Sequence, residues 1–122
     1  MAKWVSATVL DGALSVIASA TRMVALAGQP SNFAEAQAGR LAEAVLAPGE
    51  FTNGPGETSG RRIAVPAKTG VPVLASGTAD HVALLDPGQS RLLYVTTCPP
   101  QSLVAGGTVN FASWSIEIGD PV

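Results

Sequence analysis

The chain has 122 residues, of which 47% are apolar and 13% charged, enough for a single domain spanning 1–122 with its own core. Seven Lys and Arg against nine Asp and Glu give a net charge of -2, which excludes the basic surface that nucleic acids and anionic membranes attract. One Cys and one His exclude an intrachain disulfide and a structural zinc site of the Cys/His type, and no apolar run is long enough to cross a bilayer.

The residue composition and the spacing of apolar residues change near the middle of the chain. We expect an N-terminal arm over 1–8, an Ala-rich part with helical spacing over 9–48, and a β-rich part with many turns over 49–122. Asp11 interrupts the apolar N-terminal stretch, so we expect that stretch to belong to the mature protein and not to a secretory signal.

The first predicted element is a helix over 9–20, capped by Thr8, with Asp11 facing its positive end. The apolar residues that recur at helical spacing are Leu10, Ala13, Leu14, Ile17 and Ala20. A short apolar strand over 23–27 follows and ends before Pro30.

A second, short helix is predicted over 32–37, with Asn32 as its cap and Glu35 three residues later. Because Gly39 interrupts the pattern, we expect extended chain after it, although propensity alone favours one longer helix.

Strand patterns dominate from Phe51 onward. Three glycines and a proline predict a loop over 52–60, and the alternation around Ile63 and Val65 predicts a strand. Val71 and Val73, separated by Pro72, predict an edge strand.

A β-hairpin is predicted next, from strands over 79–85 and 90–97. The turn over 86–89 places Pro87 and Gly88 at its two central positions, with φ > 0 at the glycine. We expect Cys98-Pro99-Pro100 to end the second strand, because proline has no N–H to donate.

The last strand is predicted over 114–118, following a turn at Gly106-Gly107. Its apolar residues are out of phase with Val109 and Phe111, so we expect a bulge or bend near Ala112.

Together these elements predict a mainly β (α+β) fold. We expect an antiparallel β-sandwich or barrel-like sheet, with one N-terminal helix and a second short helix. In that single sheet system the residues predicted to be buried are Ile63, Val65, Trp114, Ile116 and Ile118.

Candidate catalytic residues are few. His81 is the one histidine, and without a Gly-x-Ser-x-Gly elbow we interpret it as a satisfied histidine at a strand end. Cys98 has no cationic neighbour in sequence and is interpreted as a small apolar residue. The glycine-rich stretch 54–62 lacks the Gly-Lys-Ser/Thr ending of a phosphate loop. We therefore expect no catalytic, cofactor or metal site and no enzymatic activity.

The candidate partner-binding residues lie in two places. Lys3, Trp4 and Val5 precede the first helix, where Trp4 would either pack on that helix or anchor in a partner. Arg61 and Arg62 are adjacent in a strand and should point to opposite faces, so that one meets solvent or an acidic partner.

The motif string resembles a family of small proteins encoded among the virion structural genes of tailed bacteriophages and prophages. The motifs that carry the resemblance are Val9-Leu10-Asp11-Gly12, Phe33-Ala34-Glu35-Ala36, Thr58-Ser59-Gly60-Arg61, Gly77-Thr78-Ala79-Asp80-His81-Val82-Ala83-Leu84-Leu85-Asp86, Leu93-Tyr94-Val95-Thr96-Thr97, Leu103-Val104-Ala105-Gly106-Gly107-Thr108-Val109 and Ile116-Glu117-Ile118-Gly119-Asp120-Pro121.

The resemblance implies a capsid decoration, or cement, protein. Such a protein would be made in the bacterial cytoplasm and would sit on the outside of the mature shell, bridging subunits of the major capsid protein. We expect a homo-oligomer, with a trimer favoured, docked through the N-terminal segment and adjoining loops. The alternative is a tail or head–tail connector component.

Overall fold

The computed structural model describes residues 3–47 and 49–120. Its elements in chain order are α1 (Ala7–Ile17), β1 (Arg22–Leu26), α2 (Phe33–Gly39), β2 (Arg40–Val45), β3 (Thr52–Pro55), β4 (Arg61–Val65), β5 (Lys68–Pro72), β6 (Gly77–Asp86), the 3-10 turn η1 (Pro87–Gln89), β7 (Arg91–Leu103), β8 (Thr108–Phe111) and β9 (Trp114–Ile118).

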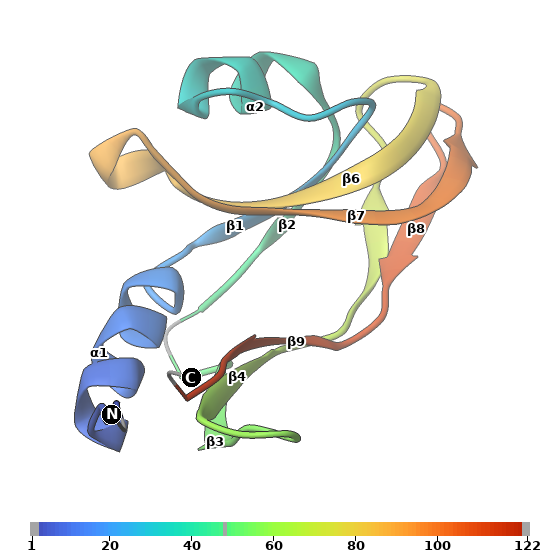
Figure 1. Cartoon of the computed structure of the whole chain (residues 1–122). Coiled ribbons are helices and arrows are strands. Elements are labelled where there is room, and N and C mark those ends of the chain that lie inside the picture. The colour runs from blue at the N-terminus through green and yellow to red at the C-terminus, as the bar shows by residue number, and fades with distance from the viewer. Residues whose placement is uncertain (1–2, 48, 121–122) are drawn as a thin grey trace.

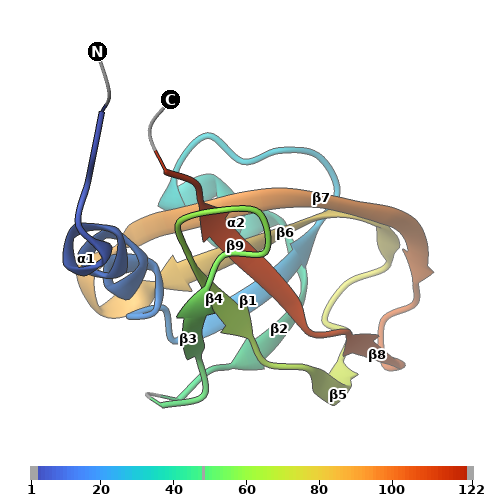
Figure 2. The same cartoon turned by 60° about the horizontal axis from the view of Figure 1, so that its bottom comes forward.

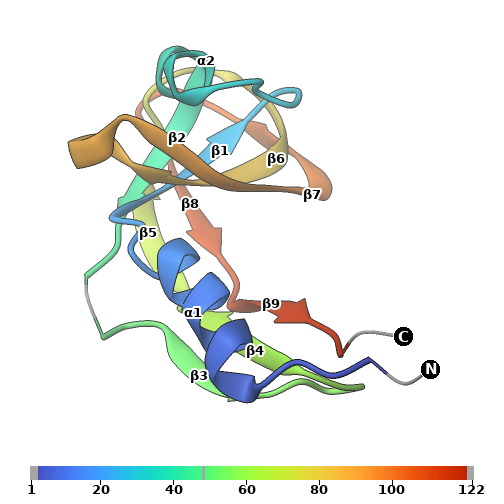
Figure 3. The same ribbon diagram turned by 60° about the vertical axis from the view of Figure 1, so that its left-hand side comes forward.

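The strands form three antiparallel sheets. A four-stranded sheet has the order β2-β1-β6-β7, a three-stranded sheet the order β3-β4-β9, and β5 pairs with β8. The first two sheets lie above one another, and the β5–β8 pair connects them along one side (Figures 1 and 3). The predicted mainly β, sandwich-like fold with two helices is therefore confirmed. The prediction of one continuous sheet system is wrong.

The chain passes between sheets at a break after β8. Residues 112 and 113 separate β8 from β9, so the two out-of-phase apolar patterns belong to different sheets. This is the bend predicted near Ala112. The turn before β8 also forms as predicted, with Gly106 at a φ of 88° that favours glycine.

The main core fills the space between the sheets, with α1 closing one side (Figure 2). Ile63, Val65 and Ile116 are buried there, as the strand alternation predicted. Trp114 and Ile118 are only half-buried, because each lies at an end of β9 where the cover over the strand stops.

A second, smaller core lies between α2 and the outer face of the four-stranded sheet (Figure 1). Ala36 of α2 and Ala83 of β6 are both fully buried in it, and their small side chains let the helix approach the sheet closely. β6 therefore supplies side chains to both cores, and its residues 82–85 are all buried.

Helix α1 begins two residues earlier than predicted and ends at Ile17. Its cap is Ser6, whose Oγ accepts from the Val9 N–H at 3.2 Å, so the predicted Thr8 cap is wrong. Asp11 does not serve the helix end. Its Oδ1 accepts from Arg61 Nε of β4 at 2.8 Å, which ties α1 to the lower sheet.

The second helix forms as predicted, short and followed by extended chain. Asn32 Oδ1 accepts from the Glu35 N–H at 2.8 Å, and Glu35 Oε1 accepts from the Ser31 N–H at 2.9 Å. This reciprocal capping satisfies two donors at the helix start. The chain then enters β2 directly at Arg40.

The predicted loop over 52–60 is partly wrong, because Thr52–Pro55 forms strand β3. It pairs with β4 in the register Thr52↔Ala64 to Pro55↔Arg61. Pairing with a neighbouring strand overrides the weak local preference of Gly54 and Pro55, and the edge position of β3 tolerates a proline.

The β6–β7 hairpin differs from the prediction at its turn. The chain turns through η1, and the residue with positive φ is Ser90, at 52°, instead of Gly88.

The second strand of the hairpin does not stop at Cys98-Pro99-Pro100, as predicted, but continues to Leu103. Its register shifts between His81↔Thr97 and Ala79↔Gln101, so residues 98–100 bulge opposite Asp80. In a bulge on an edge strand the missing proline N–H groups cost no ladder hydrogen bond.

Gly60 allows the first stability prediction. It has a φ of +71°, and a Cβ there would overlap the carbonyl oxygen of Ile118. Gly28 has a similar φ of +81° but open space around it. We expect Gly60→Ala to lower the free energy of unfolding by about 3 kcal/mol and Gly28→Ala by only about 1 kcal/mol, measured by chemical denaturation. Equal losses in the two variants would contradict the close approach of the β3–β4 hairpin to β9.

Candidate functional site

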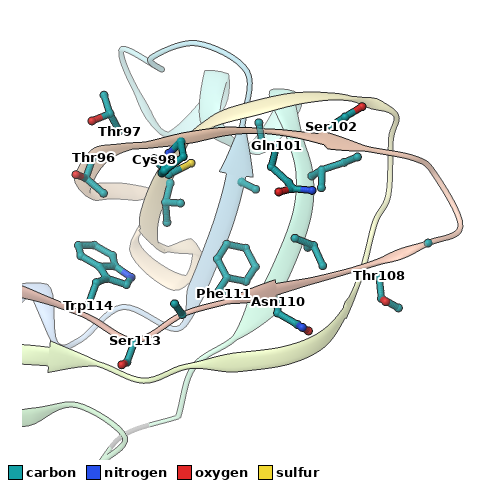
Figure 4. A pocket seen from close by; sticks show the side chains of 18 of the residues that line it. Thr96, Thr97, Cys98, Gln101, Ser102, Thr108, Asn110, Phe111, Ser113 and Trp114 are labelled. Carbon is teal, nitrogen blue, oxygen red and sulfur yellow. The ribbon is translucent and has the colours of Figure 1, made fainter.

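A groove of about 990 Å³ lies between β7 and the β8–β9 segment (Figure 4). One wall is formed by residues 96–99 and 101–104 and the other by residues 107–115. Ala25, Ala79 and Val82 of the four-stranded sheet also line it. The groove is thus built mainly from two consecutive segments of the C-terminal half.

The topology explains why these segments leave a gap. β7 is the last strand of the four-stranded sheet, while β8 and β9 each pair on one side with β5 or β4. After the turn over 104–107 the two walls diverge, and within the described residues no strand pairs between them. They approach again where the rings of Tyr94 and Trp114 pack with centroids 5.8 Å apart.

The walls of the groove are uncharged. Among the described residues that line it there is no Asp, Glu, Lys, Arg or His, and the polar groups are hydroxyls and amides. Gln101 and Trp114 extend into the space between the walls (Figure 4). Such a surface suits an uncharged, extended or apolar occupant.

Cys98 lies in the wall of this groove and is half-buried. Burial, with a smaller contribution from the negative charge of Asp80, raises the pKa of the thiol. The sulfur is therefore protonated near neutral pH, which is unsuited to a nucleophile.

His81 is held by its neighbour. Its Nδ1 lies 2.7 Å from Asp80 Oδ1, which also accepts from the Gly28 N–H at 2.8 Å. This pair connects the loop after β1 to β6. His81 pairs with Thr97 in the β6–β7 ladder, whereas the adjacent residue Cys98 packs against the main core. The His81 ring and the Cys98 thiol therefore lie on opposite faces of the sheet.

The predicted partner-binding residues lie at one end of the molecule, but they differ in availability. Trp4 is 84% exposed, which contradicts packing on the first helix. Arg61 forms an ion pair with Asp11 of the same chain and is therefore less available to a partner. Arg62 points to the other side of β4, as predicted, where its Nη1 lies 3.1 Å from Glu57 Oε1 at the surface.

The end of the molecule that carries these residues also holds the tip of the β3–β4 hairpin. We call this surface the arm end and define it by Lys3–Val5, Glu57–Gly60, Arg62 and Asp120. Lys3–Val5 and Asp120 line one small hollow, and both described chain ends lie on this side (Figure 3).

The hairpin tip is held firmly at the arm end. Asp120 N–H donates to Ser59 Oγ at 3.0 Å, Glu57 N–H donates to Glu117 Oε1, and Gly56 N–H donates to the Gly60 carbonyl at 2.9 Å. The hairpin tip is therefore the rigid part of the arm end, and it lies beside the extended segment Lys3–Val5.

Over residues 3–47 and 49–120, no group of three or more His, Cys, Asp or Glu side chains is placed to hold a metal ion. Over the same residues, no helix has the length and apolar character needed to cross a membrane.

The sequence predicted Lys3, Trp4, Val5 and Arg62 as partner-binding residues, but it did not predict the rest of the arm end or the groove. The available signal was the run of Thr, Ser, Pro and Val over 96–115, which carries no charge. It was interpreted as a strand end and a turn, because the continuation of β7 past its prolines was not foreseen.

Comparison with known proteins does not assign this chain to a family. No protein-family description, no curated protein and no solved structure matches this chain.

The Asp80–His81 pair yields a prediction on pH. Hydrogen bonds from His81 and then from Gly28 hold the pKa of the Asp80 carboxyl below its usual value. We expect its NMR titration midpoint to lie below that of an ordinary aspartate and to rise in His81→Ala, with Arg91→Ala as the control that leaves it unchanged.

The sign of the stability effect follows from this pKa. Because the folded value is lower than the unfolded one, the contact stabilises the fold above the unfolded pKa, and this contribution is lost as pH falls through the folded pKa. A midpoint at or above the usual value in the unmodified protein would contradict the hydrogen bonds described here.

Proposed function

We propose that this protein is a non-enzymatic virion component, a capsid decoration protein that binds the outside of the mature shell and bridges major capsid subunits. Two lines of support are the resemblance of its motifs to small virion proteins of tailed phages and the low charge of the chain. The observation that carries the proposal is the arm end, where Arg62 and Trp4, a large apolar side chain that is 84% exposed, lie beside a hairpin tip held by hydrogen bonds and offer contacts to protein partners, other copies of this chain included.

Exposed tryptophan is costly in water and valuable at an interface. Tryptophan, tyrosine and arginine are the residues most often found at the energetic centre of protein contacts. Trp4 and Arg62 both belong to the arm end, next to the hairpin tip that Ser59 and Asp120 hold in place. We therefore assign the arm end as the surface that meets protein partners.

The stabilising mechanism is linkage. A ligand that binds the expanded shell more tightly than its precursor stabilises the expanded state in proportion to its occupancy. A homo-oligomer, with a trimer favoured, engages several equivalent sites at once on a symmetric shell, so that modest individual contacts give firm attachment. No chemical step at His81 or Cys98 is needed.

The direct test is cosedimentation with shells assembled from the major capsid protein of the phage or prophage that carries this gene. We expect binding to expanded shells and little binding to unexpanded precursors. Arg62→Glu should weaken binding at least tenfold, because it removes a cation from the arm end and places a second carboxylate near Glu57.

The control is Arg91→Glu. Arg91 makes a similar surface ion pair, with Asp86 at 2.9 Å, beside the β6–β7 turn and away from the arm end. We expect it to bind like the unmodified protein. Absence of binding to expanded shells would overturn the decoration function, and equal weakening by both variants would overturn the assignment of the arm end.

Copy number per virion separates the proposal from its alternative. Several hundred copies fit a decoration protein, whereas a single ring fits a tail or head–tail connector component.

The non-enzymatic part of the proposal has its own test. We expect purified protein to show no turnover in a screen of ester, peptide and glycoside substrates, because the His81 ring is paired with Asp80 and the Cys98 thiol has a raised pKa. Turnover that disappears in His81→Ala or Cys98→Ala, with Arg91→Ala as the control, would show that the protein is an enzyme.

A further inference from the structure

We propose that the groove between β7 and β8–β9 receives the N-terminal arm of a second copy of this chain, with Trp4 as the anchor. The arm is residues 3–6, which precede α1 without helix or strand pairing. The inference rests on the oligomer in the proposed function, and it names the contact that would build that oligomer.

The arm has the form of a ligand. Trp4 is 84% exposed and Ser6 is extended, with φ −72° and ψ 151°. Burying a tryptophan removes about 150–250 Å² of surface from water, a large gain for so short a segment. The extended backbone of Ser6 directs the preceding residues away from α1, so that their backbone groups are free to pair with a strand edge.

The groove has the form of a receptor. Its volume of about 990 Å³ is more than one indole ring fills, and its walls are strand edges that no described residue pairs across. An extended segment could therefore donate and accept backbone hydrogen bonds along a wall while its side chains fill the space between the walls. The half-buried Trp114 provides aromatic surface for an indole (Figure 4).

The arm and the groove are compatible in charge, because each is nearly uncharged. The described lining of the groove is uncharged, and Trp4, Val5 and Ser6 carry no charge. Lys3 is the single charged residue of the arm, and its ammonium group can remain in water at the mouth of the groove. A charged segment, such as one rich in Glu, would lose its hydration in this site without gaining a partner.

The position of the arm points to another molecule. Lys3–Val5 lie beside Asp120, beyond the far end of β9, whereas the groove ends at Ser115. The arm also runs away from the body of the molecule (Figure 2). Since the Asp11–Arg61 pair fixes α1 against β4, the root of the arm cannot swing freely toward its own groove.

Such a contact joins two different surfaces, arm to groove, and is therefore head-to-tail. Head-to-tail contacts repeated about a rotation axis close into a ring, in which every arm and every groove is occupied. One arm buries much less than the 1,200–2,000 Å² of a typical stable interface, so closure of the ring is needed for stability. In this arrangement the hairpin tip and Arg62 remain for the shell.

The first experiment measures self-association without shells, by native mass spectrometry and light scattering over a range of concentrations. We expect a trimer for the unmodified protein. Trp4→Ala should raise the dissociation constant at least tenfold, and so should Gln101→Lys, which places a cation in the groove facing Lys3. The control is Leu74→Ala, since Leu74 is also an exposed large apolar residue, at 53%, but lies outside the groove.

The second experiment uses the single native cysteine, Cys98, which lines the groove. We expect Val5→Cys, under mild copper–phenanthroline oxidation, to form a disulfide with Cys98 of another copy. Mixing unlabelled and ¹⁵N-labelled protein identifies the link as interchain. Val9→Cys is the control, because Val9 is 60% exposed but lies on α1 outside the arm.

The outcomes are distinct. A monomer at all concentrations, an oligomer that Trp4→Ala leaves intact, or a disulfide confined to one chain would each overturn the inference. A dimer held by exchanged arms would uphold the arm-to-groove contact and overturn the ring of three. Self-association of this kind without binding to shells would leave the inference standing while the decoration function fails.

Discussion

The pairing of β6 with β7 is the interaction on which the rest of the structure depends. Because β6 also pairs with β1 on its other edge, its alternating side chains fill the main core on one face and the α2 core on the other. The bulge at residues 98–100 lets β7 continue to Leu103 in spite of two prolines. Because β7 continues, the chain reaches the far side of the molecule before it turns. β8 and β9 then run back across the open side, and the groove is the space between them and β7.

Local sequence patterns were sufficient for most elements but not for their ends. The short second helix could be predicted because Asn32 and Glu35 supply both halves of a capping arrangement. Thr52–Pro55 was missed because its strand is imposed by pairing with β4, against local preference. The hairpin turn was misassigned because the positive φ falls on Ser90, a residue that rarely adopts it. The bend near Ala112 was predicted from the phase of the alternation, but the division of the strands among three sheets depends on pairing between distant strands.

The candidate site shows a similar division. Exposure of Trp4 was one of two predicted possibilities, and composition alone could not choose between them. The two arginines were predicted to face opposite ways, but the partner of Arg61 could not be predicted, because Asp11 lies fifty positions away in the chain. The uncharged run over 96–115 was not sufficient to predict the groove, since the existence of the groove depends on where two strands diverge.

The apolar composition of the core affects how the stability of this fold depends on salt. No polar or charged residue is among the fully buried ones that the structure describes, and the described ion pairs lie at or near the surface. Dissolved salt screens surface pairs over about 10 Å at 0.1 M but leaves apolar contacts intact, and sulfate or phosphate strengthens them. We therefore expect the packing of the core to depend little on ionic strength.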